Sequence, residues 1–181
     1  MPRPPLARER VLDAFEELVL GDGERAATIE ATAKAAGVSK GGLLYHFGSR
    51  DELVAGLLAR LDTLTAADLV RMAADPEGPV VYYIRTSVME DEALDRALIA
   101  ASRLAQGGSV AAADALRAAR HQWEDAIRPH VRDETSLDLV MLVSDGLYFN
   151  NSLDVNGTEH LVPQGADLDR LIDVVLRTAS R

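Results

Sequence analysis

Cysteine is absent from the 181 residues of this sequence. Disulfide bonds and thiolate metal sites are therefore excluded, which fits a protein of a reducing cytosol. Long apolar runs are absent as well, since none approaches the roughly 18 to 20 residues that cross a bilayer. The charged N-terminus MPRPPLARERV is not followed by the apolar segment of a signal peptide. We therefore expect a cytoplasmic protein that does not contact a membrane.

The sequence also lacks the residue patterns of an enzyme. An all-helical enzyme would need a nucleophile, a metal cluster or a paired acid and base. The four histidines are scattered, and none stands at a metal-ligand spacing such as H-E-x-x-H. They are His46, His121, His130 and His160. We expect no catalytic site, no metal and no cofactor.

Positive charge is scarce, and its distribution is uneven. The net charge is −10, yet residues 1–60 hold 8 Lys and Arg against 9 Asp and Glu, and residues 61–181 hold 11 against 20. Both lysines, Lys34 and Lys40, lie in the first third of the chain. An acidic remainder weakens non-specific attraction to nucleic acid but leaves room for a local basic surface.

Helical periodicity runs through nearly the whole chain, and no segment alternates as a strand does. The patterns predict helices over about 6–20, 29–36, 40–47, 49–73, 79–88, a segment capped by Ser87 or Asp91 and ending at 104, 109–127, 135–152 and 166–179. The sequence Asp75-Pro76-Glu77-Gly78-Pro79 is the strongest break. We predict an all-α protein with one domain over residues 1–50, linked by the helix 49–73 to a second domain over residues 51–181.

The stretch from Thr28 to Phe47 has the pattern of two short helices joined by a tight turn. Thr28 and Ser39 are suitable N-caps, because their hydroxyl oxygens can accept free amide hydrogens of a first helical turn. Gly37 can adopt the left-handed conformation that ends a helix. The pattern is typical of a helix-turn-helix that places a recognition helix in the major groove of DNA. An ordinary helical corner is the alternative.

Three segments together resemble the TetR family of bacterial transcriptional repressors. They are T-x-x-x-x-A-x-x-A-G-V-S at Thr28 to Ser39, K-G-G-L-L-Y-H-F at Lys40 to Phe47, and G-S-R-D-E-L at Gly48 to Leu53. The resemblance covers about the first third of the chain. Three residues depart from the family pattern: Glu30, Thr32 and Leu44, the last of which stands where many members have a tyrosine.

The resemblance implies a dimer that binds a double-stranded DNA operator. By this resemblance, DNA phosphates would be held by Thr28, Ser39, Lys40, Tyr45, His46 and Arg50. Gly41 and Gly42 would let the recognition helix approach the base edges closely. For His46, a hydrogen bond that holds the helix is an equal alternative.

The two last predicted helices have the composition of an interface. The segment 135–152 is apolar on most of its circumference, so it needs burial on nearly all sides. Pairing with 166–179 and with the same two helices of a second chain would supply that burial and the two-fold symmetry of a DNA-binding dimer. The alternatives are a central helix within one subunit and a helical protein-interaction adaptor that does not bind DNA.

Large side chains with polar groups occur among the aliphatic C-terminal helices, as they do around small-molecule pockets. The candidate ligand-binding residues are Tyr82, Arg85, Met89, Trp123, Asp145, Tyr148 and Phe149, with Tyr83, His121 and Asn150 nearby in sequence. Arg85 favours an anionic ligand, and Asp145 is either a pocket acid or an interface residue. An ordinary core is the alternative. We expect a repressor that an unknown small molecule releases from its operator.

Overall fold

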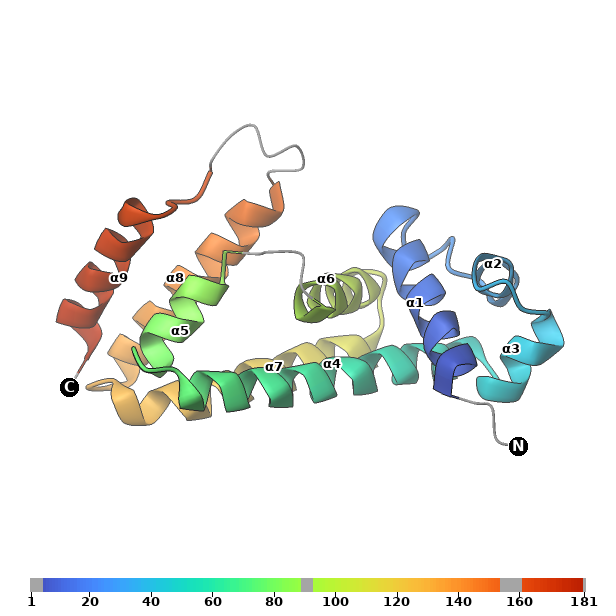
Figure 1. Ribbon diagram of the computed structural model, residues 1–181, viewed down its shortest axis with the longest axis horizontal. Helices are drawn as coiled ribbons and strands as arrows, with labels where there is room; N and C mark the ends of the chain where they lie inside the picture. Colours follow the sequence, from blue (N-terminus) through green and yellow to red (C-terminus); the bar gives the residue numbers. More distant parts are fainter. Residues whose placement is uncertain (1–4, 89–92, 154–160, 181) are drawn as a thin grey trace. The chain divides into compact units, whose positions relative to one another are not determined.

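The computed structural model describes residues 5–88, 93–153 and 161–180, which form nine α-helices and one 3-10 helix (Figure 1). The α-helices are α1 (Pro5–Gly21), α2 (Ile29–Ala35), α3 (Lys40–His46), α4 (Arg50–Ala74), α5 (Pro79–Thr86), α6 (Ala93–Gln106), α7 (Val110–Ile127), α8 (Glu134–Leu153) and α9 (Ala166–Ala179). Among these residues, extended backbone pairs only in an isolated bridge between Val131 and Ser180. The predicted all-α fold is confirmed.

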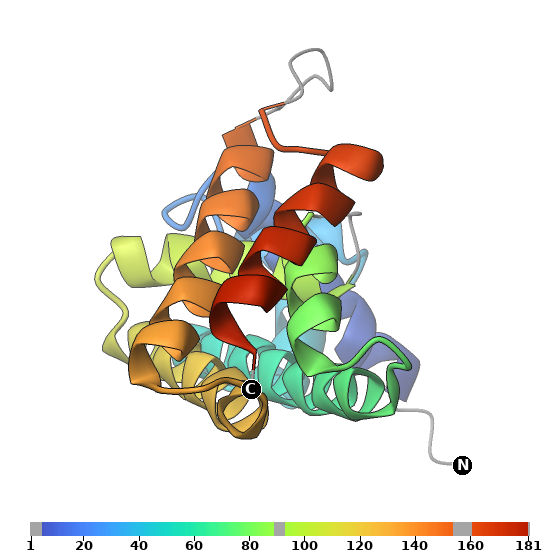
Figure 2. The same ribbon diagram turned by 90° about the vertical axis from the view of Figure 1, so that its left-hand side faces the viewer.

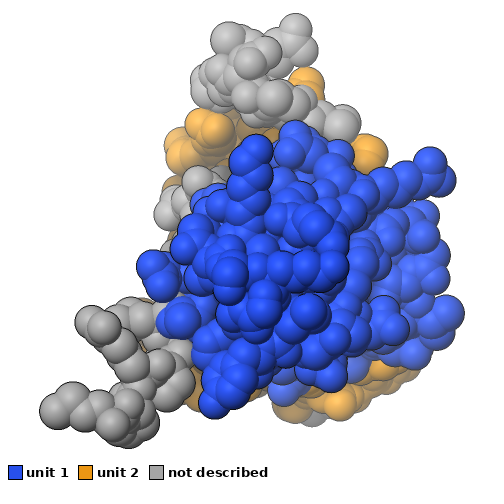
Figure 3. All heavy atoms as spheres, turned by 90° about the vertical axis from the view of Figure 1, so that its right-hand side faces the viewer, with its two compact units in different colours: residues 1–65, 93–119 blue, residues 66–92, 120–181 orange. Residues whose placement is uncertain are grey.

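The helices pack as two compact units, which Figure 3 shows in blue and orange. Unit 1 comprises residues 1–65 and 93–119, and unit 2 comprises residues 66–92 and 120–181. Both α4 and α7 continue from one unit into the other. Packing therefore groups α6 with the first three helices, whereas the functional division at residue 50 remains a prediction.

The core of unit 1 lies where α1 meets α2, α3 and α6 (Figure 1). The predicted apolar stripe of α1 is buried, with Val11 and Phe15 fully inaccessible to solvent. It packs with Leu43 and Phe47 from the α3 segment and with Leu104 of α6. This core fixes which face of α3 remains outside.

Unit 2 contains α5, α8 and α9 side by side (Figure 2). The structure modifies the expectation that α8 is apolar on nearly all sides. Val140 and Met141 are buried, but Leu142 is 65% exposed and Phe149 62% exposed. One face of α8 therefore presents large apolar side chains that are mostly exposed to solvent.

The predicted helix boundaries agree with the structure within a few residues, except for one cap. Ser87 does not begin α6: it follows α5, and its hydroxyl donates to the Tyr83 carbonyl oxygen at 2.6 Å. The alternative cap, Asp91, lies outside the described residues, as does most of the loop predicted after α8. Among the described helices, none combines the length and the apolar character needed to span a membrane.

Candidate nucleic-acid interface

Two hydroxyl caps and one glycine shape the corner between α2 and α3. Thr28 Oγ1 accepts the Ala31 amide at 3.1 Å, and Ser39 Oγ accepts the Gly42 amide at 3.0 Å. Gly37 has a φ of 66°, which favours glycine because it lacks a Cβ. The caps and the turn predicted from the sequence are therefore present, and they start α3 at a defined residue.

The recognition-helix candidate α3 has one buried and one exposed face. Leu43 and Phe47, four residues apart, are anchored in the core of unit 1. On the other side, Tyr45 is 86% exposed and Leu44 is 37% exposed. Part of the Leu44 side chain is covered by the protein. Tyr45 is therefore the side chain of this face that projects further into solvent.

Lys40 and Glu30 form an ion pair across the corner. The Lys40 ammonium donates to Glu30 Oε1 at 2.6 Å, which joins the first turn of α2 to the first residue of α3. This hydrogen bond holds the pKa of Glu30 below its usual range. Both side chains are well exposed, so the pair contributes little to stability. The pair places a carboxylate against the Lys40 ammonium, the group predicted to contact a DNA phosphate.

Arg50 differs most from its expected role as a phosphate contact. Its guanidinium donates to the Ala27 carbonyl oxygen at 3.3 Å, and to the backbone oxygen and a carboxylate oxygen of Glu24, both at 3.0 Å. These three hydrogen bonds join the start of α4 to the loop between α1 and α2. Arg50 therefore positions the corner through Nε and Nη2, and its contact with a DNA phosphate stays a prediction.

The remaining predicted DNA contacts lie close together around α3. His46 is half-buried, and its ring meets Tyr45 edge-on with 5.3 Å between the ring centres. A Cβ on Gly41 would meet nothing within 4 Å, whereas one on Gly42 would lie 3.2 Å from Ser39 Oγ. Gly41 thus leaves open space on the exposed face, and Gly42 leaves room for the capping serine.

Helix α6 also holds the end of α1, a contact that was not predicted from the sequence. The Arg103 guanidinium donates to the Val19 carbonyl oxygen at 3.2 Å and also to that of Leu20, so it caps the end of α1. At the end of α6, a Cβ on Gly107 would lie only 1.6 Å from a carboxylate oxygen of Glu24. A larger residue at position 107 would have to displace the Glu24 side chain, which lies against the end of α6.

A buried carboxylate organises the polar side chains of unit 2. Asp68 of α4 is 5% exposed. Its Oδ1 accepts the Tyr82 hydroxyl at 2.7 Å and Arg71 at 3.3 Å, and its Oδ2 accepts the Trp123 indole N–H at 3.0 Å. An aspartate four residues before the buried Met72 is a polar residue on an inward helix face, and this signal could have identified it.

Further polar contacts lie next to this carboxylate. The rings of Tyr83 and Trp123 are 5.9 Å apart between centres, and burial raises the pKa of Tyr83 far above its usual range. The hydroxyls of Ser87 and Ser144 form a buried hydrogen bond between α5 and α8. Hydrogen bonds of Asp68 thus join α4, α5 and α7, and the serine pair joins the end of α5 to α8.

The structure brings together only some of the predicted ligand-binding residues. Tyr82 and Trp123 meet at Asp68, but Asp145 pairs with Arg120 at the surface. Phe149 is exposed and Tyr148 is half-buried, while Met89 lies outside the described residues.

The argument for an anionic ligand from Arg85 does not hold. Its side chain is exposed and forms ion pairs with Glu77 and Asp169. Both of these carboxylates already compensate the guanidinium charge.

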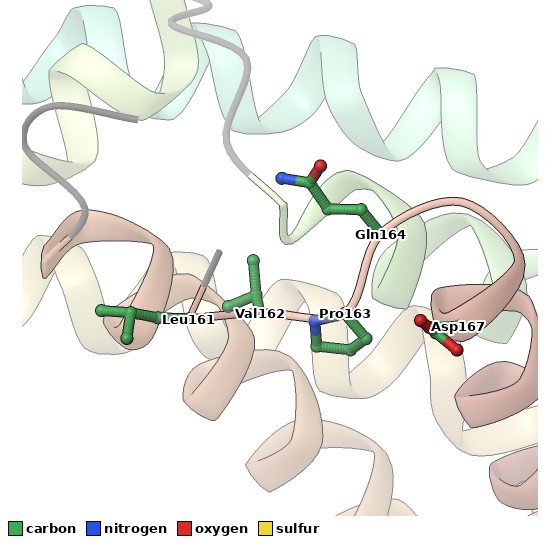
Figure 4. A pocket seen from close by; sticks show the side chains of 5 residues that line it. All are labelled: Leu161, Val162, Pro163, Gln164 and Asp167. Carbon is green, nitrogen blue, oxygen red and sulfur yellow. The ribbon is translucent and has the colours of Figure 1, made fainter. Parts of the chain in front are cut away.

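A surface hollow of about 380 Å³ lies at the segment before α9 (Figure 4). Its lining residues are Leu161, Val162, Pro163, Gln164 and Asp167. None of them belongs to the predicted ligand-binding set. Over the described part of the chain, no group of three or more His, Asp or Glu side chains is arranged to hold a metal ion.

Comparison with known proteins matches the N-terminal helices to one family. Residues 11–57 match the model of the bacterial regulatory proteins of the tetR family. This segment contains most of α1, all of α2 and α3, and the start of α4. No curated protein matches the chain.

Solved structures resemble the chain over nearly its full length. A transcriptional regulator from Rhodococcus sp. Rha1 is 26% identical, with 95% of this chain and 97% of that chain covered and a TM-score of 0.69. The ketosteroid transcriptional regulator KstR2 of Mycobacterium tuberculosis is 22% identical, with 96% and 95% covered and a TM-score of 0.57. The multidrug binding protein EbrR, complexed with malachite green, is 20% identical, with 99% and 100% covered and a TM-score of 0.64.

The family match covers the same helices whose caps, turn and exposed face form the corner described above. The similarity of fold extends the likeness beyond those helices to the end of the chain. The segment that contains α2 and α3 therefore matches the tetR family of bacterial regulatory proteins, and the fold of the whole chain is similar to that of a transcriptional regulator.

Proposed function

We propose that the protein is a homodimeric repressor that places α3 of each subunit in the major groove of an operator and is released by a small molecule. The observation that supports this most directly is the exposed face of α3, with Tyr45 outermost, on a corner fixed by two caps. A two-fold dimer would place its two recognition helices about 34 Å apart, or somewhat more, along the duplex. Binding to chromosomal DNA would place the protein in the cytoplasm.

The residues around α3 would have different roles on DNA. Tyr45 and Lys40 would donate to phosphates, and Lys40 would leave Glu30 to do so. The hydroxyls of Thr28 and Ser39 accept amide hydrogens, so each keeps its own proton to donate to a phosphate oxygen. Gly41 would allow close approach to the groove.

The proposed dimer interface uses the exposed faces of α8 and α9. Leu142 and Phe149 are seven residues apart on α8, and Val174 of α9 is 51% exposed. Covering these side chains with a second copy would remove apolar area from water, which is favourable by roughly 25 cal/mol for each Å².

Charged residues on these two faces complement each other. On α8, Asp138 and Asp145 stand four residues before and three residues after Leu142. On α9, Arg170 and Arg177 stand at the same offsets from Val174. Packing α8 of one chain against α9 of its partner would bring carboxylates to guanidinium groups, with Asp145 and Arg170 exchanging their present partners Arg120 and Asp167, which favours this pairing over α8 against α8.

The proposed effector site is the cluster around Asp68. A buried carboxylate with Trp123 and Tyr82 bound to it suits a cationic ligand, because a cation compensates the carboxylate and is attracted to aromatic faces. In the free protein, Arg71 supplies that positive charge. A ligand that replaced Arg71 would change the contacts between α4, α5 and α7.

A mobility-shift assay with duplexes from the DNA flanking its own gene tests the DNA-binding proposal, with sedimentation as the measure of oligomeric state. We expect binding at low salt by a dimer. Failure to bind any of this DNA, by protein that is folded and dimeric, would contradict the proposal and favour an interaction adaptor.

The single tryptophan gives a direct test of the effector site. Malachite green, present in the EbrR structure, is a suitable first probe. We expect it to quench Trp123 fluorescence and to release the duplex over the same concentration range. Release of DNA without any change at Trp123 would place the effector elsewhere.

A further inference from the structure

The exposed face of α3 has few groups that can read bases by hydrogen bonding. Its sequence, KGGLLYH, contains no Arg, Asn, Gln, Asp or Glu, the side chains that make the usual contacts to base edges. Lys40 is paired with Glu30, and the half-buried His46 lies against Tyr45. Sequence-specific binding by this helix therefore needs another source of discrimination.

Leu44 is the one aliphatic side chain of α3 that reaches the surface. It is 37% exposed, whereas Leu43 beside it is completely buried. Gly41 stands three residues earlier on the same helix face, and the space that its Cβ would occupy is open, with no neighbour within 4 Å. The apolar tip of Leu44 is thus accessible to a surface that approaches α3.

The major groove offers one apolar group to such a side chain. The C5-methyl of thymine is the base substituent with which apolar residues make contact there, since the other groups that identify a base are hydrogen-bond donors and acceptors. Contact between an exposed leucine and this methyl group removes apolar area of both from water, which is favourable. Contact with a polar base edge would instead leave hydrogen-bonding groups of the base unpaired.

We infer that Leu44 selects a thymine at one fixed position of each operator half-site through contact with the C5-methyl group. This inference rests on the proposed function, in which α3 enters the major groove. It is based on the position of Leu44 next to Gly41, on a helix face with few side chains that can form hydrogen bonds to bases. Exposure alone would not carry it, because Val70 and Val110 are more exposed on other helices.

Replacing thymine by uracil tests the contact, because deoxyuridine pairs as thymidine does and lacks only the methyl group. A duplex is first selected by the protein from a random-sequence pool, and each thymine is then replaced singly by uracil. We expect one position per half-site to be sensitive, with a loss of about four-fold in affinity at each half-site, the value of one buried methyl-sized group. Uracil at the other positions should have little effect.

Two variants assign the effect to Leu44. Leu44→Ala should bind duplexes with thymine or uracil at the sensitive position with equal affinity. The effects of the protein substitution and of the base replacement would then not be additive. Val110→Ala removes an exposed apolar side chain elsewhere in unit 1 and should keep the full sensitivity. Thermal unfolding of both variants shows whether they are folded, and the wild-type comparison of thymine with uracil does not depend on either variant.

The outcomes separate the inference from the proposed function. Equal binding of wild-type protein to thymine and uracil duplexes at every position would overturn the role of Leu44 and leave the DNA-binding proposal intact. Sensitivity that persists in Leu44→Ala would assign the methyl contact to another residue and also overturn the inference. No enrichment of any sequence from the pool would overturn both.

Discussion

Buried polar groups differ between the two packing units. In unit 1, Glu16 Oε1, Thr32 Oγ1 and Thr65 Oγ1 are buried and have no hydrogen-bond partner among the described residues. In unit 2, the side chains of Asp68, Ser87 and Ser144 are buried and bonded. A buried polar atom without a partner costs free energy, whereas a bonded one depends on each of its partners.

This difference predicts how each unit responds to the loss of a buried polar group. Unit 1 presents α3 on an apolar frame, and removal of its unpartnered polar atoms should not harm that frame. The polar network of unit 2 is complete without a ligand, so a ligand would have to exchange its contacts. Such an exchange is one way in which binding can bias the position of helices. Four substitutions test this comparison.

The largest effect is expected in unit 2, from Asp68→Ala. This change leaves the Tyr82 hydroxyl and the Trp123 indole N–H without their acceptor and should destabilise the protein by about 3 to 5 kcal/mol, the cost of breaking a buried polar pair. Denaturant unfolding measures it. Asp68→Asn keeps an acceptor oxygen and should lose less. Equal stability of Asp68→Ala and wild type would show that the network is not needed.

The next effect is expected at Arg50, a bonded polar group of unit 1. Arg50→Ala removes three hydrogen bonds to Glu24 and Ala27 and should cost about 1 to 2 kcal/mol, reduced because the side chain is still 34% exposed. Its DNA affinity should fall without a change in the slope of log K against log salt. Lys40→Ala, by contrast, should lower that slope by about one. A lower slope for Arg50→Ala would show that Arg50 contacts a phosphate, as the family resemblance implies.

A gain in stability is expected from Thr32→Val. The side chain is completely buried and its hydroxyl has no partner, so replacing the hydroxyl by a methyl group should stabilise unit 1 by about 1 kcal/mol. Thermal unfolding measures the change, with Thr28→Val as a control that should destabilise because Thr28 caps α2. A loss of stability in Thr32→Val would mean that the hydroxyl is bonded after all.

The smallest effect is expected at Glu16 and depends on pH. Burial raises its pKa above the ordinary 4.5, against the opposing effect of Arg60. The folded state therefore binds the proton more tightly than the unfolded state, and stability from this group falls as pH rises from 4.5 through the raised pKa. Unfolding of wild type and Glu16→Gln across this range measures it. The variant should gain on the wild type as pH rises, and a constant difference would contradict the assignment.

The local features of the corner were predictable from the sequence because their partners are close in the chain. Thr28 and Ser39 each cap an amide three residues later, and the conformation of Gly37 follows from its missing Cβ. The stripe of α1 was predictable for the same reason, since a helix repeats every 3.6 residues. A family resemblance in those segments then led to the correct fold for the whole chain.

Contacts between distant residues were not predictable in this way. Arg50 and Glu24 are separated by 26 positions, and Asp68 and Trp123 by 55. Composition identified Trp123 as a candidate but gave no indication that it meets an aspartate of α4. The apolar composition of α8 also concealed that Leu142 and Phe149 share an exposed face, because burial depends on which neighbours pack against each side.

The central claim is that the exposed face of α3 binds DNA, and a carboxylate placed on it tests that claim most directly. A Cβ at Gly41 would meet no neighbour within 4 Å, so Gly41→Glu should fold normally, and Gly21→Glu in α1, where a Cβ is equally free of neighbours, is a control with the same charge. On the flanking-DNA duplex, we predict that Gly41→Glu lowers affinity by at least about 100-fold through repulsion of phosphates, with unchanged thermal stability, while Gly21→Glu changes it little. Equal affinities of the two variants and the wild type would contradict the account.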